Sequence, residues 1–468
     1  MISLLWLRRD LRVHDQQALL AAAAGAEHLV PVFCFDDRLL HGRHSSGPRT
    51  QFLLESLQDL DHSLRERGSQ LVIRRGVPEL VLVSLARELG AERVHFSADV
   101  GPFARARDER VSLGLRQAGI DVHVHPGLFV ADDLGAIRTA RGTPYTVFTP
   151  FYRTWSAAGR RAVAPAPRSL PPPAPGLDAG TLPALAALQL RQELQDPMPG
   201  GERAGRERMR KFISAAIAGY HTDSHMPGRD GVSRLSPYLH LGCVSARELE
   251  QLATAGEGLA AFRRQLCWRD FYAHVLLHFP ANTRAEHQPR YRGTLEFSRA
   301  RRLFDAWREG RTGYPLVDAG MRQLLREGWM HNQTRLLAGS FLTKDLGIDW
   351  RWGERWFMRL LLDGDQASNN GNWQWIASVG VDPQPPYRRI YNPVRQQARF
   401  DPHGTYVHRY LPELRQVPDE YLAEPWKMPT EVQRRAGCAI GRDYPAPIVD
   451  HAHARRHALA RYAAVSSR

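Results

Sequence analysis

Tryptophans gather in one stretch of this chain, and their side chains can do chemistry. Six of the eleven lie between residues 329 and 375, namely Trp329, Trp350, Trp352, Trp356, Trp373 and Trp375. Indole rings can stack on a planar ligand or a nucleic-acid base, and they can also pass electrons. A large core explains any single tryptophan equally well, so the pattern leaves both interpretations open.

Two segments could hold a polar or phosphate-bearing ligand. Gly228–Gly242 places Ser233, Arg234 and Ser236 where a helix is expected to begin. Backbone N–H groups at a helix start attract phosphate, and serine and arginine side chains add donors. An ordinary capped turn has the same composition. In Gln265–His274, the predicted helix places Gln265, Trp268, Arg269 and Asp270 on two adjoining faces, where surface salt bridges are an equally good interpretation.

The segment Asp363–Trp375 (DGDQASNNGNWQW) has two carboxylates two residues apart. An EF-hand calcium loop is excluded because Ala367 stands where a ligand is needed and no glycine occupies the sixth position. Aspartate and asparagine ahead of Gly371 can instead cap a helix and hold a polar cofactor.

Cysteine and histidine spacing indicates no metal site and no redox motif. The four cysteines lie far apart in sequence, without CxxC spacing, at Cys34, Cys243, Cys267 and Cys438. This spacing excludes a zinc ribbon and a disulfide framework. The dense histidine group His451, His453 and His457 is interpreted as part of a solvated tail helix.

Composition and charge narrow the class of protein. The chain has 468 residues with 43% hydrophobic and 24% charged residues, which predicts two or three ordinary globular domains. It has no apolar run of about 18 residues and no signal-peptide pattern, so we expect no membrane span and a cytoplasmic location. The net charge of +14 favours a polyanionic partner, nucleic acid first.

Strand and helix patterns alternate over positions 1–130. We predict strands at 3–7, 29–35, 70–74, 93–97 and 122–125, and helices at 16–24, 49–67, 77–89 and 103–118. This alternation predicts a doubly wound, parallel, five-stranded α/β sheet of the Rossmann type. The first crossover, Arg8–His14, lacks glycine and is neither a P-loop nor a dinucleotide fingerprint.

Residues 164–176 are dense in proline, which predicts an extended surface segment without regular secondary structure. We therefore place an interdomain linker at 131–200. After residue 200 helical periodicity dominates, which predicts an all-helical domain over 201–468 built around a ligand. The predicted helices are 202–218, 237–241, 246–253, 259–278, 298–309, 315–328, 333–346, 350–362 and 373–379.

Taken together, these segments resemble the photolyase/cryptochrome flavoprotein family, and most closely its bacterial class I cyclobutane-dimer DNA photolyases. The most specific blocks are SRLSPYLHLG, CWRDFY, GRTGYPLVDAGMRQLLREGWMHNQTR and DGDQASNNGNWQW, and the match runs from Leu4–Leu19 to Phe400–Leu414. The resemblance implies an antenna chromophore in the α/β domain, a U-shaped FAD in the helical domain, and UV-damaged DNA across a basic face. We expect a monomer.

The resemblance also implies roles for individual residues. Asn369 matches the position that faces flavin N5, where a neutral amide suits an anionic reduced flavin. Trp373 and Trp350 match the inner two members of an electron-carrying tryptophan chain. The expected FAD contacts are Tyr220, Ser233, Arg234, Leu235, Ser236, Gln265, Arg269, Asn332, Arg335, Asp363, Asp365 and Asn369.

The implied reaction is light-driven repair: reduced FAD lends an electron to a flipped-out cyclobutane pyrimidine dimer, the dimer splits, and the electron returns. The expected lesion contacts are Trp268, Asn332, Gln333, Leu336 and Trp375, with Gln265 also assigned a catalytic role. Asn332 and Leu336 replace the two histidines of (6-4) photolyases, which disfavours that branch.

Four positions depart from the family pattern. Gln265 replaces a glutamate that bonds the lesion, Gln333 an arginine, and Leu336 a methionine. Phe297 aligns with the outermost tryptophan of the electron chain, which predicts slow or rerouted photoreduction, with Tyr291 as a candidate route. These departures keep a second function open, a cryptochrome-like blue-light photoreceptor with weak or no repair.

The antenna segment Ser97–Asp108 resembles the deazaflavin-binding type, because Phe103 and Ala104 stand where folate-binding relatives carry an Asn-Glu pair. The resemblance therefore implies 8-hydroxy-5-deazaflavin, with Arg49, Asp99 and Phe103 as contacts. An empty or flavin-filled site stays open as an alternative.

Overall fold

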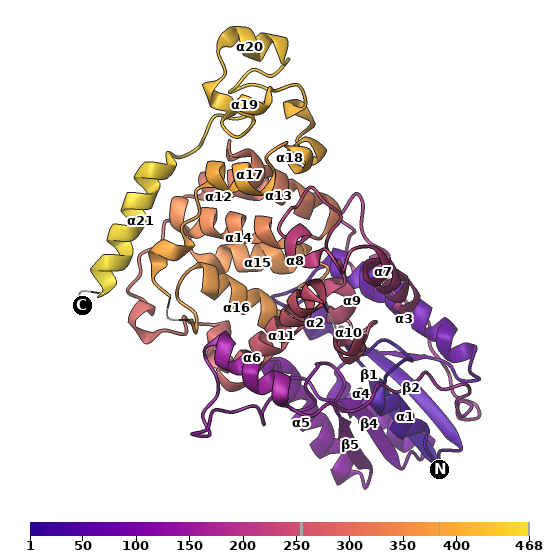
Figure 1. Ribbon diagram of the computed structural model, residues 1–468. Coiled ribbons are helices and arrows are strands. Elements are labelled where there is room, and N and C mark those ends of the chain that lie inside the picture. Colours follow the sequence, from indigo (N-terminus) through magenta and orange to yellow (C-terminus); the bar gives the residue numbers. More distant parts are fainter. Residues whose placement is uncertain (253–255, 383, 467–468) are drawn as a thin grey trace.

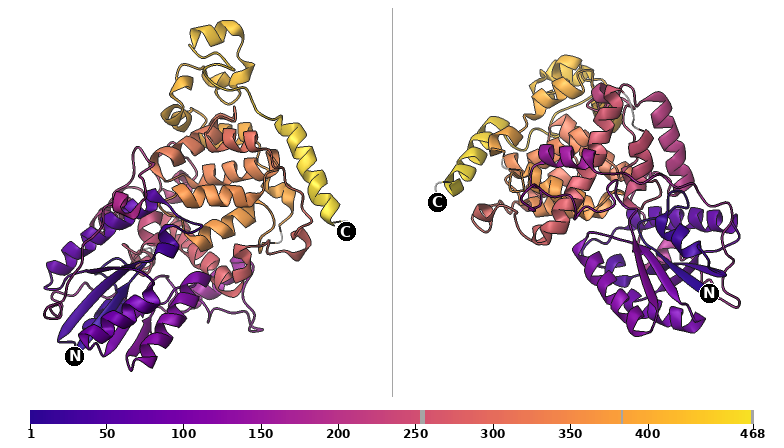
Figure 2. Two further views of the ribbon diagram at one scale, coloured as in Figure 1. Left: turned by 180° about the vertical axis from the view of Figure 1, so that it is seen from behind. Right: turned by 60° about the horizontal axis from the view of Figure 1, so that its bottom comes forward.

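The structure is a computed structural model that describes residues 1–252, 256–382 and 384–466. A sheet flanked by helices forms one end of the molecule, and a larger helical part packs against the ends of its strands (Figure 1). Two further views show the same arrangement, with the C-terminal helix running along the outside of the helical part (Figure 2).

The sheet confirms the predicted five-stranded, parallel α/β fold. Its strand order is β3-β2-β1-β4-β5, so the chain winds outward from a central β1 in both directions. The strands are β1 (Ile2–Leu7), β2 (His28–Phe35), β3 (Val72–Arg75), β4 (Arg93–Ser97) and β5 (Asp121–His125), each within two residues of its prediction. Every residue from Ser3 to Leu7 is buried, as expected for a strand covered by helices on both faces.

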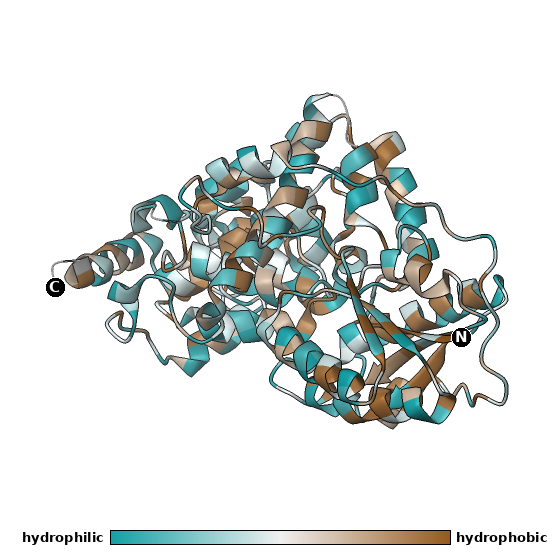
Figure 3. Ribbon diagram, turned by 90° about the horizontal axis from the view of Figure 1, so that it is seen from below, coloured by the Kyte–Doolittle hydropathy of each residue, from teal (hydrophilic) through white to brown (hydrophobic). Residues whose placement is uncertain are grey.

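The helices that cover the sheet also match the prediction. They are α1 (Gln17–Ala23), α3 (Gly47–Arg65), α4 (Pro78–Leu89) and α5 (Pro102–Gln117), joined by a short unpredicted helix, α2 (Asp37–Leu40). Gly90 ends α4 in the left-handed region at φ 62°, where its N–H bonds back to Ala86 O. Coloured by hydropathy, the strands stand out as an apolar layer between amphipathic helices (Figure 3).

The proline-rich segment 164–176 runs along the sheet as irregular chain. Leu29 N–H donates to Pro172 O, and Leu170 N–H donates to Arg67 O, which fastens the segment to β2 and to the end of α3. Before it lies α6 (Phe148–Ala157), a helix that the sequence analysis did not predict, and after it the 3-10 turn η1 (Leu185–Leu188).

Helices make up most of the remaining chain, as predicted. They are α7 (Glu202–Ala215), α8 (Tyr220–Asp223), α9 (Ser236–His240), α10 (Ala246–Leu252), α11 (Glu257–His278), α12 (Arg301–Arg308), α13 (Pro315–Glu327), α14 (Asn332–Ser340), α15 (Trp350–Leu360), α16 (Gln366–Ile376), α17 (Pro393–Phe400), α18 (Thr405–Tyr410), α19 (Asp419–Leu422), α20 (Thr430–Arg435) and α21 (His451–Ser466). The 3-10 turns are η2 (Pro280–Thr283), η3 (Pro289–Tyr291), η5 (Pro386–Arg389), η6 (Pro412–Leu414) and η7 (Pro425–Lys427).

Two predicted helices differ from those observed by more than three residues at one end. α16 begins at Gln366 and not at Trp373, because Asp365 caps it by accepting the Ser368 N–H at 2.8 Å. The helix predicted over 333–346 stops at Ser340 and continues as a π-helical turn, η4 (Phe341–Asp345). The helix predicted to end at Ala253 is α10, and that last residue lies outside the described residues.

The tail helix is α21, but the prediction that it is solvated is wrong for one of its faces. Ala454, Ala458, Tyr462 and Val465 are all buried, and His451 Nδ1 lies 2.5 Å from Asp345 Oδ1. Their spacing of three and four residues places these side chains on one side of the helix, so packing holds it against the helical part.

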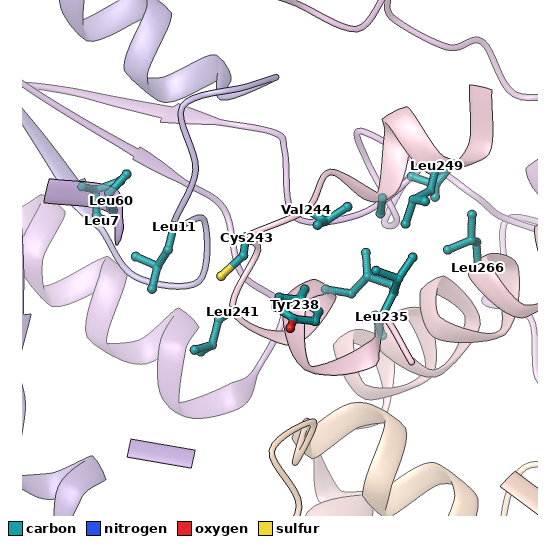
Figure 4. Close-up of a cluster of buried hydrophobic side chains, with 14 of the residues drawn as sticks. Leu7, Leu11, Leu60, Leu235, Tyr238, Leu241, Cys243, Val244, Leu249 and Leu266 are labelled. Carbon is teal, nitrogen blue, oxygen red and sulfur yellow. The ribbon is translucent and has the colours of Figure 1, made fainter. Parts of the chain in front are cut away.

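The two parts of the molecule share one hydrophobic core. Leu7, Leu11 and Leu60 of the N-terminal part belong to the same buried cluster as Leu241 and Leu266 of the helical part (Figure 4). Fully buried Arg12 adds polar bonds across the junction, because it donates to Gly242 O and to Gly127 O, each at 2.9 Å. The junction is therefore fixed by core packing, and it orients the helical part over the strand ends.

Candidate functional site

A cavity of about 290 Å³ lies among α8, α9, α11, α14, α15 and α16. All the residues that the sequence analysis assigned to FAD line it: Tyr220, Ser233, Arg234, Leu235, Ser236, Gln265, Arg269, Asn332, Arg335, Asp363, Asp365 and Asn369. They come from separate segments of the chain that are far apart in sequence, so tertiary packing alone unites them.

The Ser233–Ser236 segment forms one wall, at the start of α9. Arg234 adopts φ 50°, unusual for a residue with a side chain, and its guanidinium lies 4.6 Å from the Trp329 ring. Glu327 Oε2 accepts from Arg234 Nη1 at 3.1 Å, which fixes the direction of the guanidinium. The Leu235 side chain is buried and belongs to the hydrophobic core.

Two carboxylates also line the cavity, and each is paired. Arg335 donates to both oxygens of Asp363, at 3.1 and 2.8 Å. Arg9 donates to Asp365 at 2.6 Å. Burial alone would raise the pKa of Asp365, but Arg9 and then His240 hold it well below its usual range. The Asp365 carboxylate therefore stays ionised at neutral pH, and both carboxylates are fixed in position by their arginines.

Asn369 has a buried side chain whose orientation is set by one hydrogen bond. Its Nδ2 donates to Glu354 O at 3.0 Å. Because the amide nitrogen is committed to the backbone, Oδ1 is left as the acceptor that Asn369 presents to the cavity.

Two polar atoms on residues that line this cavity are unsatisfied. Arg234 Nε and His240 Nδ1 are buried and have no hydrogen-bond partner among the described residues. Buried donors and acceptors are normally paired. The unpaired atoms are therefore consistent with a polar ligand in the cavity.

A second pocket of about 320 Å³ adjoins the cavity and shares six of its residues with it. It is lined by Gln265, Trp268, Arg269, Tyr272, Asn332, Leu336, Ser368, Asn372 and Trp375. Four of the five predicted lesion contacts are here. Gln333 is not among the lining residues, because its Nε2 lies 2.8 Å from His225 Nδ1.

The two predicted stacking tryptophans of this pocket are held from behind. Phe148 of α6 lies parallel to Trp268, with ring centroids 3.7 Å apart and planes 3° apart. The Arg389 guanidinium lies 4.1 Å from the centre of the Trp375 ring, and Trp375 Nε1 donates to Asp382 at 3.1 Å. The sequence analysis missed Phe148, and the helical spacing of Phe148, Phe151 and Trp155 was the available signal.

The electron-chain positions are buried. Trp373 lines the cavity, and Trp350 is fully buried with its Nε1 donating to Glu286 at 3.3 Å. The aligned outer position, Phe297, is only partly buried. The rings in contact with Trp373 are Phe357 at 5.0 Å and Trp307 at 6.2 Å, and the sequence analysis singled out neither of them.

A further cavity, of about 430 Å³, lies between the carboxyl ends of the strands and the helical part. The predicted antenna residues Arg49, Asp99 and Phe103 all line it. Arg49 already donates to three backbone oxygens, those of Met358 at 2.7 Å, Leu361 at 3.2 Å and His44 at 2.6 Å, so much of its donor capacity is committed.

Asp99 caps its own loop by accepting the Gly101 N–H at 3.1 Å, and it faces Arg9 at 3.5 Å. Phe103 is 37% exposed at the rim, with the Arg38 and Arg107 guanidinium groups over its ring. His240 and Asp365 line both this cavity and the one in the helical part. A thin polar wall therefore separates the two cavities.

Other kinds of site find no support in the part of the chain that the structure describes. There, no group of three or more His, Cys, Asp or Glu residues could hold a metal ion, and no helix is long and apolar enough to cross a membrane. Cys34, Cys243, Cys267 and Cys438 are all buried and free.

Comparison with known families identifies both parts of the chain. A family described as "DNA photolyase" matches residues 3–174, and "FAD binding domain of DNA photolyase" matches residues 262–464. The chain therefore carries an FAD-binding domain after an α/β domain, as predicted.

Individual proteins match over nearly the whole chain. A deoxyribodipyrimidine photo-lyase of Streptomyces griseus is 41% identical over 95% of this chain and 96% of its own length. The crystal structure of a class III photolyase from Agrobacterium tumefaciens is 35% identical, with a TM-score of 0.93 over 100% of this chain and 98% of that one. A Synechocystis cryptochrome is 29% identical, with a TM-score of 0.88 over 98% of each chain.

Proposed function

The chain belongs to the photolyase/cryptochrome family, and from that premise we propose that it splits cyclobutane pyrimidine dimers in UV-damaged DNA with the help of light. The proposal rests on one observation, that two cavities lie next to each other. A cavity lined by every predicted FAD residue lies beside a pocket flanked by Trp268 and Trp375.

FAD would be held in the cavity by residues of matching chemistry. The backbone N–H groups and hydroxyls around Ser233 and Ser236, with the unpaired Arg234 Nε, suit its phosphates. The carboxylates of Asp363 and Asp365 suit hydroxyl and N–H donors of the ribityl chain, ribose and ring. When bound, FAD supplies the electron that light transfers to the lesion and that returns after the bond is split.

The chain's own residues set the protonation and charge around the flavin ring. Asn369 Oδ1 would accept a hydrogen bond from a protonated ring nitrogen, which favours the reduced form. Arg335 and Arg269 both line the cavity and would offset the negative charge of a reduced, anionic ring. A neutral amide at position 369 adds no opposing charge.

The lesion would enter the open pocket after flipping out of the duplex, at a cost of a few kcal/mol that is smallest for a damaged base. Trp268 and Trp375 would pack against its apolar parts. Gln265 and Asn332 would bond its carbonyl and N–H groups through neutral amides, and Leu336 would contact its hydrocarbon edge. Gln333 lies outside this pocket, so we propose for it only a contact with the DNA strand.

We propose that the cavity at the strand ends holds the antenna, an 8-hydroxy-5-deazaflavin. Aromatic residues such as Trp6 and Phe33 suit a planar ring system, and Arg8, Arg43 and Arg107 suit an anionic substituent or tail. Mass spectrometry of chromophores released from the purified protein tests this. A second flavin or a folate in place of the deazaflavin would contradict the assignment.

The remaining elements of the proposal concern organisation. We propose an antenna domain over 1–130, a linker over 131–200 and an FAD-binding catalytic domain over 201–468, acting as a monomer in the cytoplasm. Light scattering coupled to gel filtration tests the monomer. A second candidate function, blue-light reception without repair, is favoured by the likeness to the Synechocystis cryptochrome.

One assay separates repair from reception. An oligonucleotide with a single thymine dimer is incubated with chemically reduced protein, in blue light and in the dark, and restored thymines are counted. Repair predicts light-dependent restoration with FAD as the extracted flavin. Stable FAD binding without restoration would favour the photoreceptor, and absence of FAD would remove the cofactor assignment for both.

A further inference from the structure

A buried hydrogen-bond network lies behind the part of the cavity wall that Arg234 forms. Its centre is Glu327, the last residue of α13, which is 8% exposed. Glu327 Oε1 accepts from the hydroxyl of Tyr410, and Oε2 accepts from Gln323 Nε2 and from Arg234 Nη1, each at 3.1 Å. Of these three donors Arg234 alone lines the cavity, so the network acts on the cavity through its guanidinium.

Gln323 fixes this network to the rest of the helical part. It is 1% exposed, and its Oε1 accepts from Tyr406 OH at 2.6 Å and from the His331 N–H at 3.1 Å. Its Nε2 also donates to Tyr410 OH at 2.9 Å. Both tyrosines belong to α18, which packs against α13 (Figure 1). The Glu327 carboxylate is therefore held by partners that are buried and bonded to one another.

Trp329 holds the Arg234 guanidinium from another side. The guanidinium carbon lies 4.6 Å from the centre of the Trp329 ring, and Trp329 Nε1 donates to Ser236 Oγ at 3.3 Å. Arg234 Nε is buried and has no hydrogen-bond partner among the described residues. Because Glu327 occupies only one edge of the guanidinium, Nε remains as a donor for a ligand in the cavity.

This arrangement gives the cavity a cation whose direction is set before a ligand binds. A free arginine side chain loses rotamer freedom when a ligand orders it, which weakens binding. Arg234 is already ordered by a carboxylate and an indole. Guanidinium groups bond phosphate oxygens through directed N–H groups. The ordered cation therefore favours a flavin that carries phosphates, and it contributes little to the binding of one without them.

We propose that Glu327 is a positioning residue that orients Arg234 toward a diphosphate, and that it thereby makes the cavity select a flavin dinucleotide over riboflavin. The proposal rests on the proposed function, in which FAD fills the cavity with its phosphates near Arg234. Tyr410 acts through Glu327. Among the described residues, the last that lines the cavity is Ile376, so α18 takes part in cofactor selection from outside the cavity.

The test measures which flavin the purified holoprotein retains. The protein is equilibrated with FAD and a varied excess of riboflavin, freed of unbound flavin by gel filtration, and its bound flavins are separated by chromatography and quantified. The riboflavin excess at which the two are bound equally gives the selectivity. Titration with riboflavin alone gives the affinity for the flavin ring, which a merely structural loss would also lower.

Two variants weaken the network in different ways. Glu327→Gln removes the charge that holds Arg234 and should lower the selectivity for FAD about tenfold. Tyr410→Phe removes a donor to Glu327 without changing any charge, and should lower it about fivefold. The affinity for riboflavin should change by less than about twofold in both variants, because selectivity is a difference between two affinities.

The same helix offers matched controls. Tyr444→Phe removes another buried phenol that donates to a carboxylate of α13, Asp318, at 2.7 Å. Glu413→Gln removes another carboxylate paired with an arginine of that helix, Arg322, at 2.7 Å. Neither tyrosine nor glutamate of these controls lines the cavity, and both variants should keep the selectivity within about twofold.

An unchanged selectivity in Glu327→Gln, with equal losses of both flavins, would assign Glu327 a structural role and overturn the proposal. A raised selectivity would overturn it as well, because it would show that the carboxylate repels the phosphates. If Glu327→Gln fails to fold, Tyr410→Phe decides between the same outcomes. Unaltered protein that retains neither flavin would instead contradict the proposed function, so the two failures are distinguishable.

Discussion

Arg9 Nη2 lies 2.6 Å from Asp365 Oδ2, and this ion pair joins the segment after β1 to the cap of α16. Arg9 also donates to His240 O at 3.1 Å, and both His240 and Asp365 line the cavity of the helical part and the cavity at the strand ends. One arginine of the α/β part therefore helps to position residues of the helical cavity.

Removing Arg9 should weaken both the fold and the FAD site. We expect Arg9→Gln to cost about 3 kcal/mol, because it leaves the Asp365 carboxylate buried without its main cation. Urea unfolding and FAD retention on gel filtration measure the two effects. Arg203→Gln is the control, since Arg203 pairs with Asp59 at the surface and should cost no more than about 1 kcal/mol. Equal costs would show that the Arg9 pair has no special role.

Stability should fall as the pH drops below about 6.5, the usual histidine pKa, and part of the loss should come from His331. Its side chain is 1% exposed, and burial, with Arg335 and Arg234 nearby, lowers its pKa to about 3. The unfolded chain binds a proton in this window and the folded chain does not, so His331 contributes up to about 1.4 kcal/mol per pH unit.

His331→Asn should flatten this dependence between the two pKa values and keep the α14 cap, since the His331 ring accepts from Gln333 N–H and asparagine can do the same. Urea midpoints from pH 7 to pH 4 measure the slope. His62→Asn makes the same substitution at an exposed position of α3 and serves for comparison. A slope unchanged by His331→Asn would contradict the buried, neutral state of this imidazole.

Placing a carboxylate at position 369 should make the flavin harder to reduce. Asn369→Asp puts a negative charge beside the proposed ring site, so the reduction midpoint should become more negative. Spectroelectrochemical titration of the purified holoprotein measures it. Asn392→Asp makes the same change at the α17 cap, outside the cavity, and should leave the midpoint unaltered. An unchanged midpoint in Asn369→Asp would show that the amide does not face the ring.

Phe148 should contribute to lesion binding although it does not line the lesion pocket. Phe148→Leu removes the ring behind Trp268, and aromatic pairs contribute about 0.5–1.5 kcal/mol beyond burial. We expect weaker binding of dimer-containing DNA by that amount and unchanged binding of undamaged DNA. Phe96→Leu, which removes a ring packed on Trp6 in the sheet, is the control. Equal losses on both DNAs would assign Phe148 a purely structural role.

DNA binding should weaken steeply with salt. The net charge is +14, and each phosphate neutralised by the protein contributes a slope of about −0.9 to log affinity against log salt concentration. Fluorescence anisotropy at several salt concentrations gives the slope. Undamaged duplex should show a similar slope with lower affinity, whereas a flat dependence would count against a basic binding face.

The sequence predicted most of what local pattern can determine. The five strands and the major helices follow from hydrophobic periodicity and glycine stops, and the residues predicted to bind FAD sit in dense motifs whose members line one cavity. Phe148, Trp307 and Arg9 were not predicted as site residues. Each of them contacts a residue that is distant in sequence, as Arg9 contacts Asp365. Hydrophobic periodicity predicts helices and strands, but it does not predict which distant residues come into contact.

The sequence pattern also does not predict which way a side chain points. Gln333 was placed at the lesion by its position in a motif, but on α14 it turns toward His225. The cap at Asp365 was available in the sequence, and reading it as the helix start would have corrected the beginning of α16.

The shared hydrophobic core has a consequence for how the chain matures on the ribosome. Leu7 and Leu11 emerge early, yet Leu241 and Leu266, which belong to the same buried cluster, are synthesised only after all five strands. We expect the nascent sheet to remain loosely packed, and open to proteases or chaperones, until those later helices emerge. A chimera that takes one half of the chain from a distant relative would therefore have to preserve the core residues that both halves contribute.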